Sequence, residues 1–407
     1  MTTPQKDPLR TSLRHALHHR TLRSSRRKLT TLSPSSTDFS SNDFLSLSTS
    51  PVYRARFLSH LHSAPPLHPF ASGGSRLLDG NSPYAEALES QIASFHNAPT
   101  GLLFNSGFDA NVGVLSTLPQ PGDVIVHDAL VHASAREGMR LSRAGTRVEF
   151  EHSCPRSLEA VLRKVVEEDE AVRDGGRSVF IVVESVYSMD GDVAPLREFV
   201  EVVDRVLTRG NGYFVVDEAH ATGALGPKGA GVVQELGLEG RMFVRVHTFG
   251  KALASHGDTR DYLVNYAKSL IYTTALGFPF LASIRTAYEL LAEGETQLLQ
   301  DTLQGLVTYL DARLQDLGPW DPTIFSVDHF PNSPIFSLRS AVPRELAAVC
   351  QRDGFIVRAI MAPTVPAGKE RVRVCLHAGN TMQEIDGLVG VIQGWLNRPT
   401  EGKVARL

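Results

Sequence analysis

The hydrophobic pattern between residues 84 and 250 alternates between two kinds of segment. Uninterrupted apolar runs, such as Ser178–Val183 and Met242–Val246, predict strands buried on both faces. Between them, apolar residues recur at helical spacing, as in Leu158–Val166 and Leu196–Leu207. The same reasoning predicts strands at Asp123–His127, Arg147–Glu151 and Tyr213–Val216, and helices at Ala85–His96, Ala110–Leu118 and Ala133–Ala144. This order predicts an α/β fold with a mostly parallel sheet covered by helices on both faces.

The pattern changes after Pro279. One long helical stretch, with leucines along one side, extends to about Gly318. The remaining segments predict strands at Ile335–Leu338, Phe355–Arg358 and Arg371–Leu376, and helices at Arg344–Arg352 and Met382–Asn397. We therefore expect a basic N-terminal arm or helix (residues 1–45), a large domain (46–285) and a smaller α+β domain (286–407).

The first 36 residues are rich in arginine, serine and threonine and contain one acidic residue, Asp7. Leu9, Leu13 and Leu17 share one face of a helix, which favours an exposed amphipathic helix. A mitochondrial presequence has the same composition, so it stays an alternative.

Composition narrows the class of protein. The chain has 407 residues, of which 42% are hydrophobic and 21% charged, and this excludes a disordered chain. The net charge of −3 gives no general attraction for nucleic acid, and no apolar run reaches the ~20 residues of a membrane span. Cys154, Cys350 and Cys375 are too few and too scattered for a disulfide framework or a cysteine zinc site. A large enzyme, or an enzyme-like subunit, remains.

Two residues that follow buried strands suggest a shared site. Lys251 comes shortly after Met242–Val246, where a lysine can capture a carbonyl ligand as an imine. Asp217 directly follows Tyr213–Val216, where an unpaired charge is costly and a protonated pyridine nitrogen would balance it. Because the carboxyl ends of parallel strands meet at one edge of a sheet, both side chains are expected there.

Three further segments add candidate ligands. Asn105–Asn111 opens a helix, and free backbone N–H groups at such a helix start suit a phosphate. His132 precedes another helix, and Ser188 lies in a turn after a buried strand. Each feature alone is more often structural, as an ordinary helix start, a surface histidine or an exposed loop lysine.

Together, four ordered motifs strongly resemble the α-oxoamine synthases, pyridoxal-phosphate (PLP) enzymes of fold type I. The motifs are His132-Ala133-Ser134, Ser188-Met189-Asp190-Gly191-Asp192, Asp217-Glu218-Ala219-His220 and Thr248-Phe249-Gly250-Lys251. The resemblance extends from about Leu13 to Trp395 and includes Phe39–Leu45, Ser72–Arg76, Ile271–Thr274 and Ala362–Gly368. It implies a large domain with a seven-stranded-type sheet and a smaller C-terminal α+β domain.

The resemblance also implies roles for individual residues around PLP. Lys251 would bind the cofactor covalently, Asp217 would pair with the pyridine nitrogen, and His132 would stack on the ring. The implied ligands near the ring hydroxyl are His220 and Ser188. The implied phosphate ligands are Gly107, Phe108 and Thr248, together with Thr273 and Thr274 from the partner subunit of a homodimer. The implied catalytic set is Lys251, His132, Asp217 and His220.

Substrate contacts are implied in the same way. Arg373 falls where the family binds the amino-acid carboxylate, a task suited to a guanidinium group. The implied acyl-substrate contacts are Thr364 and one of Arg26 or Arg27, and Asn42 belongs to the expected substrate residues.

The reaction that the resemblance implies is the condensation of an amino acid with an acyl thioester, with loss of coenzyme A and carbon dioxide. Pro363–Gly368 and Phe249–Ser255 most resemble the 8-amino-7-oxononanoate synthases of fungi, which favours L-alanine and a pimeloyl thioester in biotin synthesis. A 5-aminolevulinate synthase or another α-oxoamine synthase stays an alternative. So do a non-catalytic partner subunit of the same fold and an ordinary PLP aminotransferase.

One departure from the family pattern and one C-terminal motif affect these expectations. In the family an apolar strand follows the lysine loop, whereas here Gly257 is followed at once by Asp258-Thr259-Arg260 and a helix-like segment. The sheet is therefore expected to lack one strand, which would favour the non-catalytic subunit. The C-terminal Ala405-Arg406-Leu407 resembles the Ser-Lys-Leu peroxisomal address and predicts a peroxisomal protein, with the mitochondrion or cytosol as alternatives.

Overall fold

The computed structural model describes residues 7–23, 26, 29, 31, 33, 35–248, 252–255, 257–318 and 320–398. Contacts divide the chain into two units, one up to Ser36 and one from Thr37 onward. In the first unit, α1 (Pro8–Leu22) begins where the Asp7 carboxylate accepts a hydrogen bond from the Arg10 amide at 2.9 Å. All its residues are exposed, as expected for the predicted helix.

Within the described part of the second unit, the large sheet has seven strands, in the order β2-β8-β7-β6-β5-β3-β4. The bounds are β2 (Thr100–Leu103), β3 (Val124–Asp128), β4 (Thr146–Phe150), β5 (Val179–Glu184), β6 (Gly212–Asp217), β7 (Met242–Val246) and β8 (Ala252–Ser255). Five strands, β4, β3, β5, β6 and β7, run parallel to one another. Strand β8 is antiparallel to both β7 and β2. The expected loss of a strand is therefore wrong, because the four residues of β8 bridge β7 and β2.

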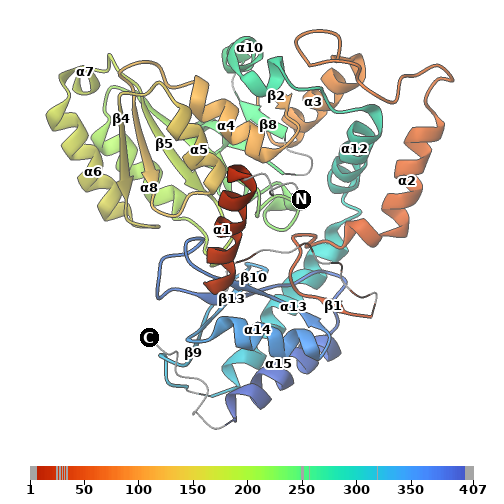
Figure 1. The fold of residues 1–407 in the computed structure, drawn as a ribbon. Coiled ribbons are helices and arrows are strands. Elements are labelled where there is room, and N and C mark those ends of the chain that lie inside the picture. Colours follow the sequence, from red (N-terminus) through yellow and green to blue (C-terminus); the bar gives the residue numbers. More distant parts are fainter. Residues whose placement is uncertain are drawn as a thin grey trace, which may run out of the picture. The chain divides into compact units, whose positions relative to one another are not determined.

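The large sheet is covered on both faces because alternate residues of its strands point in opposite directions. Ile181 packs in one cluster with helices α6 (Pro155–Glu168) and α8 (Leu196–Val206), and Val182 packs in another with α4 (Gly107–Thr117) and α5 (Ala133–Leu141). Figure 1 shows these two helix pairs on opposite faces of the sheet. The uninterrupted apolar strands of the sequence thus have a packing partner on each side.

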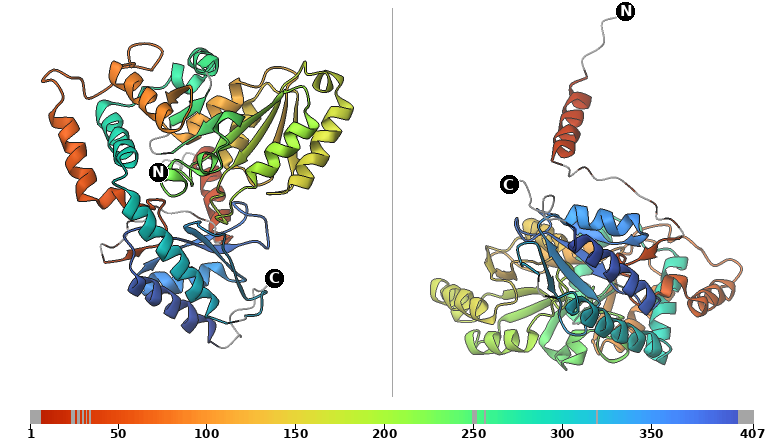
Figure 2. Two further views of the ribbon diagram at one scale, coloured as in Figure 1. Left: turned by 180° about the vertical axis from the view of Figure 1, so that it is seen from behind. Right: turned by 90° about the horizontal axis from the view of Figure 1, so that it is seen from below.

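The C-terminal part builds a second sheet. Its four antiparallel strands follow the order β12-β13-β10-β9, with β9 (Phe325–Asp328), β10 (Ile335–Ser340), β12 (Arg358–Ile360) and β13 (Arg371–Cys375). Helices α14 (Pro343–Arg352) and α15 (Met382–Leu396) and the long helix α13 (Gln297–Gln315) pack with it, in blue and teal in Figure 2. The expected single helix after Pro279 is wrong, since α12 (Phe278–Glu293) ends at the left-handed Gly294 and α13 starts anew.

The described chain also contains further short strands and α-helices. They are β1 (Thr37–Asp38), paired with β11 (Phe355–Ile356), and helices α2 (Pro51–His62), α3 (Pro83–Phe95), α7 (Glu170–Arg173), α9 (Val232–Glu235), α10 (Gly257–Tyr266) and α11 (Lys268–Ile271). In the part of the chain that is described, no helix combines the length and apolarity that a membrane crossing requires.

The turn Ser188–Asp192 joins the two sheets. From the large-domain side, His152 contacts Asp192 through Nε2 at 3.0 Å and Asp128 through Nδ1 at 2.9 Å. From the small sheet, the buried Arg371 forms an ion pair with Asp190. Within the turn, Gly191 has a φ of +76°, and an added Cβ would overlap the Ile335 carbonyl oxygen.

Candidate active site

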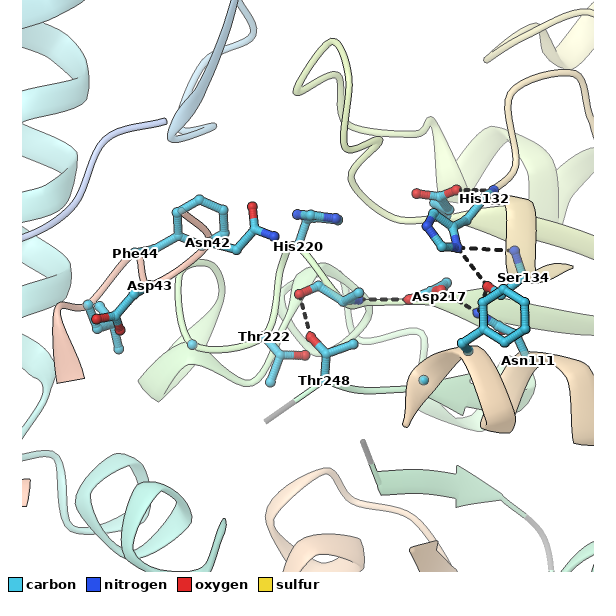
Figure 3. A pocket seen from close by; sticks show the side chains of 16 residues that line it. Asn42, Asp43, Phe44, Asn111, His132, Ser134, Asp217, His220, Thr222 and Thr248 are labelled. Atoms are coloured by element: carbon cyan, nitrogen blue, oxygen red, sulfur yellow. Dashed lines mark hydrogen bonds between the residues drawn. The ribbon is translucent and has the colours of Figure 1, made fainter. Parts of the chain in front are cut away.

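A cavity of about 380 Å³ lies at the carboxyl ends of β5 and β6. Its lining includes predicted site residues from five segments of the chain: Asn42, Gly107, Phe108, His132, Asp217, His220 and Thr248. Figure 3 shows Asn42 and Phe44 on the His220 side of the cavity and His132, Ser134 and Asn111 on the other. The carboxyl edge of the large sheet, where the sequence predicted a shared site, therefore holds a cavity lined by predicted residues.

Asp217 ends β6 with its carboxylate held by two donors. The Asn111 side-chain amide donates to Oδ2 at 2.7 Å, and the Ala219 backbone N–H donates to Oδ1 at 2.9 Å. Asn111 lies one turn into α4, so the helix that packs on the sheet also orients the carboxylate. These bonds fix an anion at the floor of the cavity, ready to pair with a cationic ring nitrogen.

His132 is fixed by the residues around it. Its Nδ1 lies 2.7 Å from the Ser134 hydroxyl, and its backbone N–H donates to Glu184 Oε1 at 2.6 Å. Burial, together with the nearby Asp217 charge, raises the pKa of Glu184 well above its usual value. The Glu184 carboxyl group is therefore more readily protonated than a free one, beside the carboxylate of Asp217.

The start of α4 offers an anion site beside these residues. Ser106 caps the helix by accepting from the Asp109 backbone N–H at 2.9 Å, which leaves the first amides, at Gly107 and Phe108, directed out of the helix. The Thr248 hydroxyl lines the same cavity and donates to the Ala219 carbonyl oxygen at 2.8 Å.

His220 faces the cavity from the turn after β6. Burial, together with the nearby Arg373 and His132, lowers the pKa of His220 to about 3, so the ring is neutral. Its Nδ1 is buried and has no hydrogen-bond partner among the described residues. The Phe44 ring lies 6.4 Å from it, centroid to centroid.

Arg373, on β13 of the small sheet, approaches the same region. Its guanidinium donates to the carbonyl oxygens of Ser188 and Ser40 at 3.2 and 3.3 Å. Its Nε is buried without a hydrogen-bond partner in the part of the chain that is described. Long bonds to neutral carbonyls leave this cation available for a carboxylate.

Other predicted residues lie elsewhere. Ser188 and Thr364 line a neighbouring cavity of about 600 Å³ rather than the main one. Thr273 and Thr274 are exposed, and the Thr274 carbonyl accepts from the Asn105 side chain at 2.7 Å.

Three predicted residues are not placed in the site. Arg26 is exposed in the first unit, whereas Lys251 and Arg27 lie outside the described residues.

Sequence reasoning missed several residues of the site. Asn111, Ser134, Glu184 and Thr222 line the cavity but were not predicted as site residues. Asn111 and Ser134 lie inside quoted motifs, so their polarity on otherwise apolar helix faces was the available signal. Glu184 ends an apolar strand as Asp217 does, and the same rule about charges at strand ends would have found it.

Comparison with known proteins defines the class. The family model "Aminotransferase class I and II" matches residues 34–392, so the chain belongs to that family. Among curated relatives, the 8-amino-7-oxononanoate synthase of Emericella nidulans (strain FGSC A4 / ATCC 38163 / CBS 112.46 / NRRL 194 / M139) is 69% identical over 406 residues, which is 98% of each chain. The aminoacyl transferase sphA of Byssochlamys spectabilis is 41% identical over 383 residues, 89% of this chain and 81% of that protein.

Solved structures show the same fold. A serine palmitoyltransferase variant from S. paucimobilis, with bound PLP and myriocin, superposes with a TM-score of 0.80 at 23% identity, covering 96% of this chain and 98% of that one. The 8-amino-7-oxononanoate synthase from Francisella tularensis gives a TM-score of 0.67 at 24% identity, covering 89% and 98%. The resemblance to PLP enzymes of fold type I is confirmed at the level of fold.

The described residues fit PLP. The cavity offers a carboxylate for the ring nitrogen (Asp217), free helix amides for the phosphate (Gly107), and an orphaned imidazole nitrogen (His220 Nδ1). An anion-binding helix start and a fixed carboxylate in one cavity suit a molecule that carries both a phosphate and a basic nitrogen.

Proposed function

We propose that this chain is a PLP-dependent C-acyltransferase that condenses L-alanine with a pimeloyl thioester. The products are 8-amino-7-oxononanoate, carbon dioxide and the free thiol, coenzyme A, and the reaction is a step of biotin biosynthesis. The new bond joins the alanine Cα to the acyl carbon, while the C–S bond and the bond from Cα to the alanine carboxylate break. The 69% identity over nearly the whole chain supports this assignment.

The observation that carries the proposal is the fixed Asp217 carboxylate facing the same cavity as His132 and the start of α4. Asp217, held by Asn111 and Ala219, would keep a proton on the ring nitrogen of bound PLP. His132, held through Ser134, would stack on the ring face of bound PLP and exclude water there. The chemistry that PLP supplies when bound is an electron sink for the carbanion at Cα.

The amino acid binds through its carboxylate. Arg373 exchanges its long bonds to the Ser188 and Ser40 carbonyls for a charge-assisted pair with the substrate. Lys251, outside the described residues, is the proposed base that removes the Cα proton.

The test is turnover by the purified protein with L-alanine and pimeloyl-CoA, followed by carbon dioxide release and mass spectrometry of the product. The wild type should absorb visible light when loaded with PLP, and Lys251→Ala should lose both the absorption band and turnover. A colourless, inactive wild type would support the non-catalytic subunit. Pyruvate formation from alanine alone would identify an aminotransferase.

A second candidate is another aminoacyl condensation, favoured by the 41% identity to aminoacyl transferase sphA. A panel that pairs alanine, glycine and serine with several acyl-CoA compounds separates the two. Preference for alanine with pimeloyl-CoA supports the first proposal, and preference for glycine with succinyl-CoA supports 5-aminolevulinate synthesis.

We also propose that the protein is a homodimer. Thr273 and Thr274 are exposed beside Tyr272, whose side chain is 79% exposed, and Phe280 and Phe70 nearby are 65% and 54% exposed. An exposed apolar patch of this kind is typical of an interaction surface. Light scattering should give twice the monomer mass, and a monomeric, PLP-loaded, active protein would refute the proposal.

Peroxisomal localisation is a further proposal, supported by the C-terminal Ala405-Arg406-Leu407, which lies outside the described residues. A fluorescent protein fused ahead of the full chain should colocalise with a peroxisomal marker. Removal of the last three residues should disperse it, whereas mitochondrial signal from the intact chain would contradict the proposal.

A further inference from the structure

The second cavity, of about 600 Å³, has a distinctive mixture of side chains. Much of its wall is apolar and comes from the loop around residues 362–367 and from Leu130, Val131 and Met189. Among the described residues that line it, Arg136 is the only one with a cationic side chain. The one acidic lining residue, Asp190, is already paired with Arg371.

Of two consecutive residues, His132 lines the main cavity and Val131 lines this one. Ser188 also lines it, and its carbonyl accepts from Arg373. An acyl chain that starts at the reaction centre can therefore extend along this apolar wall.

Arg136 lies one helical turn beyond His132, and its backbone N–H donates to the His132 carbonyl at 3.1 Å. Four residues of α-helix advance about 6 Å, and a helical side chain leans back toward the helix start. The Arg136 guanidinium follows this rule, since it donates to the Ala129 carbonyl.

The rise of about 6 Å from His132 to Arg136 suits the length of a pimeloyl chain. Six extended bonds separate its thioester carbon from its distal carboxyl carbon, about 7 Å if three bonds span ~3.3–3.6 Å as in an extended residue. We infer that Arg136 binds the distal carboxylate of the acyl substrate and so selects acyl thioesters with a carboxylate at the far end. The inference rests on the proposed function, and it adds the residue that recognises this substrate class.

Glu149 forms a weak ion pair with Arg136 and so competes with a substrate carboxylate. Its carboxylate lies 3.5 Å from the Arg136 guanidinium, and both side chains are about half exposed. A long, solvent-screened pair of this kind is weak, so an incoming carboxylate can displace it. Arg136 is therefore held near the cavity without being neutralised by a strong partner.

The experiment compares pimeloyl-CoA with heptanoyl-CoA, which has the same length but ends in a methyl group, on the full-length PLP-loaded enzyme. Arg136→Met should lower kcat/KM for pimeloyl-CoA by about 10- to 100-fold, the usual effect of losing a bond to a charged group. It should change kcat/KM for heptanoyl-CoA by less than about 3-fold, so the preference between the two collapses. Glu149→Gln should raise kcat/KM for pimeloyl-CoA by about 2-fold, in the range of a surface pair.

Arg140→Met is the matched control. Arg140 lies one turn further along α5, pairs with Glu137 and does not line the cavity, so its loss should leave both substrates unaffected. Equal loss with both substrates in Arg136→Met would show a merely structural arginine and overturn the inference.

If the wild type turns over neither substrate, the proposed function fails and calorimetric binding decides the inference separately. Tighter binding of pimeloyl-CoA than heptanoyl-CoA, lost in Arg136→Met, would still support the carboxylate site. Equal binding of the two by the wild type would overturn it.

Discussion

Asp217 and Arg373 bring opposite charges to the cavity region from the two sheets, and the chain holds them in different ways. Asp217 accepts bonds of 2.7 and 2.9 Å from Asn111 and Ala219. Arg373 makes bonds of 3.2 and 3.3 Å to main-chain carbonyls, and its Nε is unpartnered among the described residues. The contrast fits a resident cofactor on one side, which needs a rigid partner, and a substrate on the other, which comes and goes.

The largest effect is expected from Asp217→Asn, which tests the firmly held carboxylate on the cofactor side of the cavity. The substitution keeps the shape but removes the charge that keeps the ring nitrogen protonated, so kcat should fall by about 10²- to 10³-fold, as for other preorganised electrostatic groups. Steady-state kinetics and the PLP spectrum measure this. Near-normal kcat with bound PLP would mean that Asp217 is not the partner of the ring nitrogen.

A substitution at His152 tests the contact between the large domain and the turn Ser188–Asp192, which joins the two sheets. Burial alone would lower the pKa of His152, but hydrogen bonds with Asp128 and Asp192 outweigh burial and raise the pKa to about 9. A raised pKa stabilises the fold below about pH 6.5, and this stabilisation is lost as the pH rises through about 9. The free energy of unfolding should therefore fall by up to about 3 kcal/mol over this range.

Urea unfolding at several pH values measures the effect. His152→Gln should abolish most of the slope, because the variant side chain does not titrate. An unchanged slope in the variant would assign the pH dependence to other groups.

On the substrate side, Arg373→Met should raise KM for alanine by about 10- to 100-fold, since bonds to charged groups contribute about 1.5–3 kcal/mol. kcat should change less, because PLP and its ligands are untouched. Arg358→Met is the control, since Arg358 pairs across the same sheet with position 373 but is exposed. Equal effects of the two variants would contradict the role of Arg373.

The smallest effect concerns the helix start at the phosphate end. Ser106→Ala removes the cap of α4 and should cost about 1 kcal/mol of stability and weaken PLP binding several-fold. Ser50→Ala removes the equivalent cap of α2, a helix of which no residue lines the main cavity. It should cost the same stability without changing PLP affinity, which fluorescence titration measures.

The large sheet was predictable because strands buried on both faces need uninterrupted apolar residues. Met242–Val246 matches β7 in full, and Ser178–Val183 differs from β5 by one residue at each end. The strand β8 was missed because four residues, Ala252–Ser255, carry little pattern of their own. Its pairing with β2, far earlier in the chain, is a tertiary interaction that local periodicity does not reveal.

The site was predictable where motifs follow strands and open helices. His132, Asp217, His220 and Thr248 line one cavity as expected. Asn111 was missed as an Asp217 ligand because the two are far apart in the chain and meet only when α4 packs on the sheet. The separation of Ser188 and Thr364 into a second cavity likewise depends on how the small sheet docks against the turn at Ser188–Asp192.

Gly191 fixes the thickness of that docking layer. Gly191 has no side chain, and an added Cβ would overlap the Ile335 carbonyl oxygen, the Ser333 hydroxyl and the Ile335 Cβ. The position of Arg373 relative to the turn therefore depends on this close approach together with the Arg371–Asp190 ion pair. A single added methyl group at Gly191 would push the small sheet, which carries Arg373, away from the turn, while Asp217 and the start of α4 would stay in place.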